Sequence, residues 1–414
     1  MARKDRPETS LLPVEQAQEL ALQGVRRPPA VKTPLSDAIG LVLSDDVVSD
    51  RDMPPFDRAA VDGYAVVASD LQSAVESAPV LLSVVEEVQA GVVPTKAVAT
   101  GHTSKVMTGA PTPAGADAMV MVERTRSKHG SVVEFTTPVT VGQNIRPQGE
   151  DARKGDRVLG AGQVVGPPEA GILTSVGVID PVVYPRPTLA VLSTGDEVVD
   201  PSQQPKPGQI RDSNGPLLTA QARRAGVEVT QLGIASDTFE SLSRLIEQGL
   251  KSDVLVIAGG VSMGDHDIVE DVLLEFGFEM SFDRVNMKPG KPTVFGRCGD
   301  TYVFGLPGNP VSGLVAFGLF VRPLLRKVMG HHEPLPPMWP AVIDVDLRSS
   351  DPRRTYQPVS SSWKDGIWHA TPVDHHSSGD LRSIALADSL LVIPENSGGV
   401  EKGSHLDLVR LTDL

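Results

Sequence analysis

Between Asp253 and Ser312, three turns rich in glycine and proline follow strand-like apolar runs in quick succession. The turns are Gly-Gly-Val-Ser-Met-Gly-Asp-His-Asp (259–267), Met-Lys-Pro-Gly-Lys-Pro (287–292) and Gly-Leu-Pro-Gly-Asn-Pro-Val-Ser (305–312). Each turn comes where an open α/β sheet delivers its strand ends, and the first and third lead into predicted helices, whose free N–H groups attract anions. We therefore expect the three turns to form a cleft for a phosphorylated ligand.

The sequence around these turns alternates between strand and helix from Pro187 to Gly330. Apolar runs predict strands at 188–193, 227–234 and 253–258, and the last is a continuous run typical of a sheet covered on both faces. A helix closed by glycine is predicted at 216–226, and a second begins where Asp237 and Glu240 are spaced like a capping box. This pattern predicts a three-layer α/β domain.

Segments with β character flank this region. Valine-rich runs at 80–88 and 131–136 predict strands, and a short helix is predicted at 13–22. Residues 64–145 have the character of an inserted β domain, because the stretches on either side of them are both polar and rich in turns. A proline-rich linker at 331–340 leads to a compact β module.

Composition limits the class of protein. A length of 414 residues argues for more than one domain, and a net charge of -14 argues against non-specific nucleic-acid binding. The one cysteine, Cys298, is expected to be buried. The first ten residues lack the apolar core of a secretory signal. The longest apolar run, 311–321, stops at Arg322-Pro323 and is too short for a bilayer span, so we interpret it as a buried core helix. We expect a cytoplasmic protein that binds neither nucleic acid nor membrane.

The middle turn carries an unusual group of cations. Arg284, Lys288 and Lys291 place three positive charges within eight residues, with no acid among them. The prolines at 289 and 292 fix backbone angles and Gly290 permits a sharp turn, so both amines can be held toward one point. We expect an oxyanion there rather than a solvated surface loop.

The flanking turns carry further candidates. Gly259-Gly260 lets a phosphate or ring approach the backbone, and Ser262 adds a hydroxyl donor. Asp265 and Asp267, with Glu270 one turn later, could supply ligands for Mg²⁺, or an aspartate could cap the following helix; spacing alone leaves both open. Pro310 marks a helix start with Ser312 in its first turn, where a phosphate or oxyanion would fit.

Seven motifs follow one another along the chain: 54–66, Val-Met-Thr-Gly-Ala-Pro (106–111) with Gly-Ala-Asp-Ala (115–118), Gly-Glu-Asp (149–151), Ser-Thr-Gly-Asp-Glu (193–197), 259–267, 288–292 and 305–312. Together they resemble a known family, the molybdopterin molybdenumtransferases, which include the bacterial MoeA proteins and the E domain of gephyrin. The resemblance covers nearly the whole chain.

The resemblance implies a multidomain α/β plus β fold. The implied parts are an elongated N-terminal domain (1–63 and 146–186), an inserted β domain (64–145), a three-layer α/β molybdopterin-binding domain (187–330) and a C-terminal β-barrel-like domain (331–414). It also implies a homodimer whose cleft is shared between chains. The implied reaction is a step of molybdenum cofactor biosynthesis: transfer of molybdenum from molybdate to adenylylated molybdopterin, with release of AMP assisted by Mg²⁺.

The resemblance also assigns roles to residues of this chain. The positions that match the family's catalytic groups are Asp62, Asp151, Glu197, Asp237, Asp267, Lys288 and Lys291. Among these, the resemblance implies that Glu197, Asp237 and Asp267 bind the metal and that the two lysines bind molybdate. Positions matching its ligand-binding groups are Thr194, Gly195, Asp196, Gly259, Gly260, Ser262, Gly264, Arg284, Pro307, Gly308, Asn309, Pro310, Ser312, Arg353 or its neighbour Arg354, and Ser378 or its neighbour Ser377.

The chain departs from the family pattern in two notable places. Arg58-Ala59-Ala60-Val61 replaces the usual Asn-Ser-Ala-Met before Asp62, and Arg284 stands where lysine is common. An arginine binds oxyanions through a planar fork rather than a point charge, so ligand geometry there could differ. Two other functions stay open: a pterin-binding carrier or scaffold with little turnover, and an adenylyltransferase or amidohydrolase that shares the α/β domain.

Overall fold

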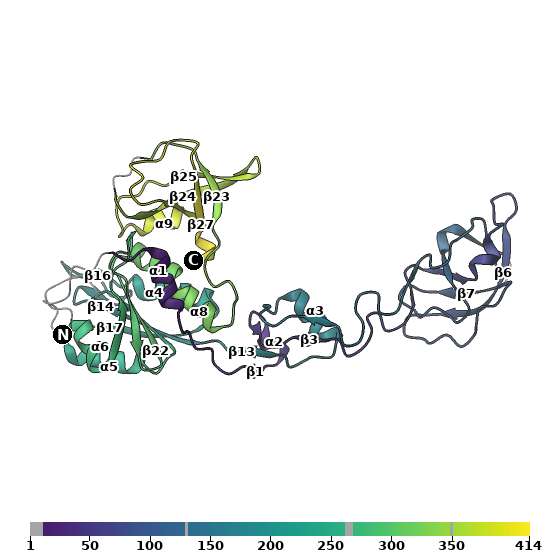
Figure 1. Cartoon of the computed structure of the whole chain (residues 1–414), viewed down its shortest axis with the longest axis horizontal. Helices are drawn as coiled ribbons and strands as arrows, with labels where there is room; N and C mark the ends of the chain where they lie inside the picture. Colours follow the sequence, from purple (N-terminus) through teal and green to yellow (C-terminus); the bar gives the residue numbers. More distant parts are fainter. Residues whose placement is uncertain (1–10, 129–130, 261–267, 348–350) are drawn as a thin grey trace. The chain divides into compact units, whose positions relative to one another are not determined.

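The computed structural model describes residues 11–128, 131–260, 268–347 and 351–414 of the chain (Figure 1). The chain forms two compact units. Among the described residues, the first unit comprises those from 11 to 44, 162 to 165 and 182 to 414, and the second those from 45 to 161 and 166 to 181. The predicted division into four parts stays a prediction, because this division into two units does not test its boundaries.

A six-stranded sheet forms the centre of the first unit. Its strands, in spatial order, are β17 (Glu228–Ala235), β14 (Thr188–Thr194), β18 (Val254–Ala258), β22 (Thr301–Leu306), β21 (Val294–Cys298) and β19 (Phe278–Phe282). The first four run parallel, while β21 and β19 pair antiparallel. All five residues of β18 are buried, as the continuous apolar run predicts for a strand covered on both faces.

Helices cover both faces of this sheet. One face packs against α1 (Val14–Leu22), α4 (Asn214–Arg224), α7 (Pro310–Ala316) and α8 (Arg322–Val328), and the other against α5 (Phe239–Gly249) and α6 (Ile268–Glu275), which lie below the sheet in Figure 1. Successive residues of β14 alternate between the two cores: Leu189 and Val191 face the first, Ala190 and Leu192 the second. The predicted three-layer architecture is confirmed, and Cys298 is buried as expected.

One local prediction about the helices is wrong, and another is confirmed. The cap of α5 is Thr238, whose side chain accepts a hydrogen bond from the Ser241 N–H, because Asp237 lies one residue too early. The apolar run 311–321 is helical and almost entirely buried, as predicted, and the helix continues past Arg322-Pro323. A π-helical turn at 317–321 passes directly into α8, whose first turn tolerates Pro323 since no N–H is required there. None of the helices within the described residues has both the length and the apolar character of a bilayer span.

The C-terminal part of the first unit is a closed barrel, which the sequence predicts as a β module. Its strands, in order around the barrel, are β24 (Arg354–Lys364), β25 (Ile367–Pro372), β23 (Trp339–Ile343), β27 (His405–Arg410) and β26 (Ser389–Ile393), which pairs again with β24. A short strand, β20 (Met287–Lys288), pairs in parallel with β24. The middle glycine- and proline-rich turn is thereby attached to the barrel.

Shorter elements complete the first unit. They are the sheet of β1 (Val31–Lys32), β13 (Val182–Tyr184) and β2 (Val42–Leu43), the helices α2 (Leu35–Ala38) and α9 (Leu381–Leu386), and the pair β15 (Val198–Val199) and β16 (Ile210–Arg211).

The second unit is built on a six-stranded sheet of its own. In spatial order its strands are β8 (Ala118–Met121), β5 (Gly63–Val66), β7 (His102–Val106), β6 (Val80–Val88), β10 (Val132–Phe135) and β9 (Thr125–Lys128). The pairs β4 (Arg58–Ala59) with β11 (Ile145–Arg146) and β3 (Val47–Val48) with β12 (Arg157–Leu159), and the helix α3 (Pro167–Ser175), belong to the same unit. Tyr64 packs edge-on against Phe135 in its core, at 5.9 Å between ring centroids.

We expect Gly63→Ala to destabilise the second unit by about 3 kcal/mol, the upper end for overpacking a core. A Cβ at position 63 would lie 1.9 Å from the Val120 carbonyl oxygen in the neighbouring strand β8, and a backbone oxygen cannot move aside. The measurement is chemical denaturation. Gly171→Ala in α3 is the matched control, since a Cβ there meets nothing within 4 Å and alanine favours a helix. Equal stability of the two variants would contradict this account of the sheet.

Candidate active site

Two cavities lie at the carboxyl ends of β14, β18 and β22, the edge where open α/β sheets bind ligands. The acidic cavity, of about 600 Å³, is lined by Glu197 and Asp237 with the glycine turns. The basic cavity, of about 570 Å³, is lined by Lys288, Lys291 and residues of the barrel. The two cavities share Pro292, Pro307 and Asn309. One continuous surface can therefore hold two chemically different groups side by side.

Two glycines, which present backbone atoms and no side chain, line the acidic cavity. Gly259 and Gly260 have φ angles of 94° and 63°, in the left-handed region that favours glycine. A Cβ at either position would lie within 3 Å of Thr194, at 2.8 Å from its carbonyl oxygen or from its Oγ1. Thr194 Oγ1 is buried in the cavity wall without a protein partner among the described residues. The turn therefore brings backbone and one hydroxyl close to whatever occupies the cavity.

The lining of this cavity includes three carboxylates, Glu197, Asp212 and Asp237, and one cation, Arg211. Asp212 is buried and accepts hydrogen bonds from Ser193 Oγ and the Gly215 N–H, so Glu197 and Asp237 are the carboxylates left to face a ligand. A Cβ at position 195 would lie 2.6 Å from Glu197 Oε2, so Gly195 allows that side chain to fold back over its own turn. Asp196 does not line the cavity; its Oδ1 accepts a hydrogen bond from the Asp237 N–H at 3.0 Å and ties the two turns together. Burial raises the pKa of Asp237, and the negative charges of Asp196 and Glu197 raise it further. A cation placed between Glu197 and Asp237 would relieve this repulsion.

Further turn residues of the acidic cavity come from the end of β22 and the start of α7. Gly308, Asn309 and Pro310 line it, and Asn309 is the N-cap residue of α7 with Pro310 in its first turn, as predicted. Asn214, at the start of α4, also lines the cavity and donates from Nδ2 to the Gly308 carbonyl at 2.8 Å. Its role was not predicted, because only the folded sheet brings α4 beside this turn.

The basic cavity is shaped by the middle turn. Gly290 has a φ of 111°, and the prolines on either side of it also line the cavity. Strand β20 fixes Lys288 beside β24 of the barrel, so the lysine turn faces barrel residues across the cavity. Lys288 and Lys291 are both exposed to solvent there. Ser312, from the first turn of α7, lines the same cavity and is almost fully buried.

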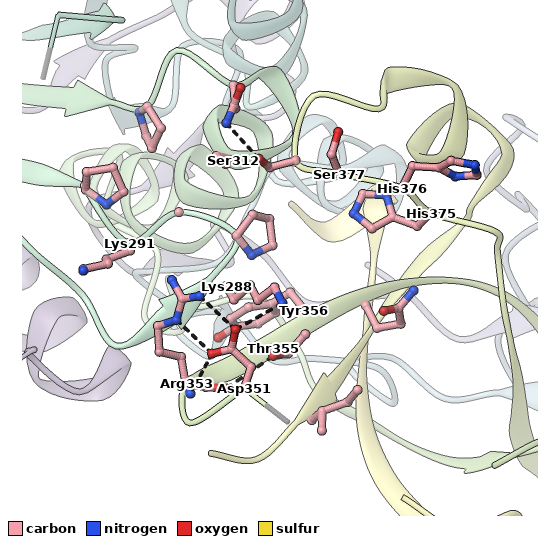
Figure 2. A pocket seen from close by; sticks show the side chains of 18 of the residues that line it. Lys288, Lys291, Ser312, Asp351, Arg353, Thr355, Tyr356, His375, His376 and Ser377 are labelled. Atoms are coloured by element: carbon pink, nitrogen blue, oxygen red, sulfur yellow. Dashed lines mark hydrogen bonds and ion pairs between the residues drawn. The ribbon is translucent and has the colours of Figure 1, made fainter. Parts of the chain in front are cut away.

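A carboxylate that the sequence did not single out lies among these cations. Asp351 accepts hydrogen bonds from Arg353 Nε at 2.9 Å and from Arg353 Nη2 at 2.8 Å, and lies 3.1 Å from Lys288 Nζ (Figure 2). The hydrogen bonds from Arg353 hold the pKa of Asp351 well below its usual range, and Lys288 lowers it further. Asp351 is therefore ionised at all ordinary pH values. A signal for it existed in the sequence, where an acid stands two residues before the arginine.

The barrel also contributes neutral polar groups. Ser377 and Ser378 both line the basic cavity, and Ser378 Oγ accepts a hydrogen bond from Asn309 Nδ2 at 2.8 Å. His375 lines it too, and its Nδ1 lies 2.8 Å from Ser383 Oγ, which itself donates to the Asp380 carbonyl. Since a hydroxyl has one hydrogen, His375 Nδ1 is the donor and Nε2 carries the lone pair. Burial lowers the pKa of His375, and the charges of His376 and Lys288 lower it further.

Several predicted site residues lie elsewhere. Arg284 lines neither cavity. Of the neighbouring arginines at the barrel, Arg353 lines the basic cavity, whereas Arg354 pairs with Glu15 and Glu395. Ser262, Gly264 and Asp267, with the alternative ligand Asp265, lie outside the described residues. The predicted third metal ligand is among them, and the described part of the chain contains no cluster of three metal-binding side chains.

Asp62 and Asp151 belong to the second unit. Asp62 Oδ1 accepts hydrogen bonds from the N–H and the hydroxyl of Thr108, at 2.6 and 2.7 Å, and these bonds lower its pKa. Asp151 Oδ1 lies 3.0 Å from Arg146 Nη2. Both side chains are thus fixed locally within that unit.

The fold and the two cavities define a multidomain α/β protein with a ligand site at one sheet edge, and comparison with known proteins gives its family. Three family models match in order: the MoeA N-terminal region (domains I and II) at 12–177, a probable molybdopterin binding domain at 190–327, and the MoeA C-terminal region (domain IV) at 340–411. The crystal structure of a molybdopterin biosynthesis moeA protein from Pyrococcus horikoshii is 32% identical, with a TM-score of 0.84 over 97% of this chain and 100% of that chain.

Curated relatives cover the chain equally well. Molybdopterin molybdenumtransferase 2 from Mycobacterium tuberculosis is 36% identical over 407 residues, covering 96% of this chain and 99% of the relative. Molybdopterin molybdenumtransferase from Staphylococcus aureus is 30% identical over 399 residues, covering 96% and 95%. The chain belongs to the molybdopterin molybdenumtransferase family, as the sequence motifs indicate. The predictions of a transferase and of a role in molybdenum cofactor biosynthesis are confirmed at this level.

Proposed function

We propose that this protein transfers molybdenum from molybdate to adenylylated molybdopterin and releases AMP with the help of Mg²⁺. The observation that carries the proposal is the pairing of the two cavities: a basic one suited to an oxyanion adjoins an acidic one suited to a metal and a phosphoanhydride. The relatives named molybdopterin molybdenumtransferases support the same reaction class. The two anionic substrates need such separate surroundings before they can meet.

The described residues fit a magnesium ion. Glu197 and Asp237 offer hard oxygen ligands in one cavity, and the raised pKa of Asp237 reflects negative charge that a cation would balance. Mg²⁺ typically takes one or two carboxylates together with substrate phosphates. We infer that Glu197 and Asp237 hold it, with Asp267 as the third ligand implied by the family resemblance. When bound, it would neutralise charge on the phosphoanhydride as AMP departs.

The roles of the other residues follow from their positions. Lys288 and Lys291 bind the oxyanion, and Ser312 and Ser378 donate hydroxyl hydrogen bonds beside it. Gly259, Gly260 and Thr194 bring backbone and a hydroxyl to the pterin nucleotide. By the family resemblance, the protein acts as a homodimer, and Asp62 and Asp151 of one chain complete the cleft of the other.

The test is a turnover assay. Purified protein incubated with adenylylated molybdopterin, molybdate and Mg²⁺ is expected to release AMP, and omission of either molybdate or Mg²⁺ should suppress release. Cofactor formation is scored by activation of a molybdenum enzyme that lacks its cofactor. A ligand that stays bound and intact through a long incubation would instead support the carrier or scaffold function.

A further inference from the structure

We propose that Asp351 is an internal substitute for the oxyanion: its carboxylate occupies the oxyanion position between Lys288 and Arg353 and leaves it when a tetrahedral oxyanion binds. This inference rests on the proposed function of the basic cavity and goes beyond it, because it assigns a residue that lowers the affinity of that cavity. Lys288 and Arg353, the cations that would bind the oxyanion, already form ion pairs with Asp351.

The contacts of Asp351 are those expected of a bound oxyanion. Its two oxygens take the paired N–H groups of the Arg353 fork at 2.9 and 2.8 Å, the bidentate geometry that arginine offers to carboxylate and phosphate alike. Lys288 Nζ lies 3.1 Å from the same Oδ2 that Arg353 Nη2 contacts. A ligand oxygen bound at these donors would have to take the place of that carboxylate oxygen.

The exposure of the three side chains suggests an order of events. Lys288 is 52% exposed, whereas Asp351 is 13% and Arg353 27% exposed. An oxyanion entering the cavity therefore meets Lys288 and the exposed Lys291 first, and displaces Asp351 from Arg353 afterwards. Asp351 Oδ1 also accepts from the Arg353 backbone N–H at 3.0 Å, a local contact that holds the carboxylate beside the site.

The alternative is that Asp351 is a permanent support that orients Arg353 and Lys288 for the oxyanion. The two roles have opposite consequences. Removing a displaceable negative charge strengthens oxyanion binding, since a carboxylate and a dianion a few ångströms apart repel each other. Removing a permanent support weakens binding, because the two cations lose their orientation.

The experiment is calorimetric titration of the full-length protein with sodium molybdate, and separately with sodium sulfate, near neutral pH and low ionic strength. Asp351→Asn keeps an acceptor for the Arg353 N–H but removes the charge, and is expected to lower the dissociation constant of both anions about tenfold. Lys288→Met in the same background should reverse the gain. Asp346→Asn is the matched control: its Oδ1 accepts from the Lys402 N–H at 2.7 Å, but it lies outside the cavity, so no change is expected.

Unchanged or weaker binding by a folded Asp351→Asn variant overturns the proposal, and thermal melting checks the fold. If wild-type binding of molybdate depends on Lys288 while Asp351→Asn has no effect, only the displacement idea fails. If Asp351→Asn binds both anions more tightly while the wild type releases no AMP in the turnover assay, the proposed reaction fails and the displacement idea stands.

Discussion

Lys288→Ala/Lys291→Ala is expected to lower molybdate-dependent release of AMP by about 100-fold or more, the cost typical of losing preorganised groups that stabilise charge in a reacting complex. Both lysines line the basic cavity, and the proline frame fixes the backbone of the turn that carries them, which reduces the entropy lost when the anion binds. Binding of the nucleotide-linked pterin should change little, because the acidic cavity keeps all of its lining residues.

The measurement separates these effects by titrating molybdate at saturating pterin substrate. The Michaelis constant for molybdate should rise steeply, whereas the affinity for the pterin, measured without molybdate, should stay near the wild-type value. Lys251→Ala/Lys402→Ala is the control, since it removes the same net charge from exposed positions outside both cavities. A double cavity variant with the wild-type response to molybdate would refute the anion site.

The second large effect is expected at the acidic cavity. Glu197→Gln and Asp237→Asn should each lower Mg²⁺-dependent AMP release by about 100- to 1,000-fold, because each removes one of the two described carboxylates inferred to hold the metal. Raising the Mg²⁺ concentration should recover part of the rate. Glu240→Gln, in the first turn of α5 and outside the cavity, should behave as the wild type.

Asp237→Asn should also raise the melting temperature of the metal-free protein. The pKa of Asp237 is raised by burial and by Asp196 and Glu197, so its ionised form destabilises the folded state at neutral pH. This penalty is present above the raised pKa and disappears as pH falls through it toward the ordinary value for an aspartic acid. The gain from Asp237→Asn should therefore vanish in acid, and also when Mg²⁺ is present. A variant that melts lower than the wild type at neutral pH would contradict this explanation.

The sequence predicted the architecture well where local chemistry dictates it. Continuous apolar runs predicted β14 and β18, and Pro310 predicted the start of α7. The capping residue of α5 was misplaced by one position, because Asp237 and Thr238 are both good caps and spacing cannot rank them. The apolar run 311–321 correctly predicted a buried helix, but its continuation through a π-helical turn into α8 was not predicted, since propensity does not foresee a helix that accommodates Pro323.

For the candidate site, the motifs indicated which turns line a cleft but not how the cleft is divided. Lys288 and Lys291 line the same cavity, as the proline-framed turn suggested, whereas the meeting of Glu197 and Asp237 in the other cavity could not be derived from their spacing along the chain. Arg284 was grouped with the lysines by proximity along the chain, yet it lines neither cavity. Asp351 and His375 were missed because they come from the C-terminal part of the chain, more than fifty residues after the lysine turn at 288–292, and only the folded structure brings them to the basic cavity.

The sequence by itself determined the family, the three-layer domain and the identity of the charged turns, because glycine, proline and apolar periodicity act over a few neighbouring residues. The tertiary structure alone decided which charges meet. The pairing of β20 with β24 places Lys288 beside a barrel whose Asp351 and Arg353 already form an ion pair. Electrostatic contacts depend on distance through space, and distances between segments far apart in the chain are set only when the sheets and the barrel have closed.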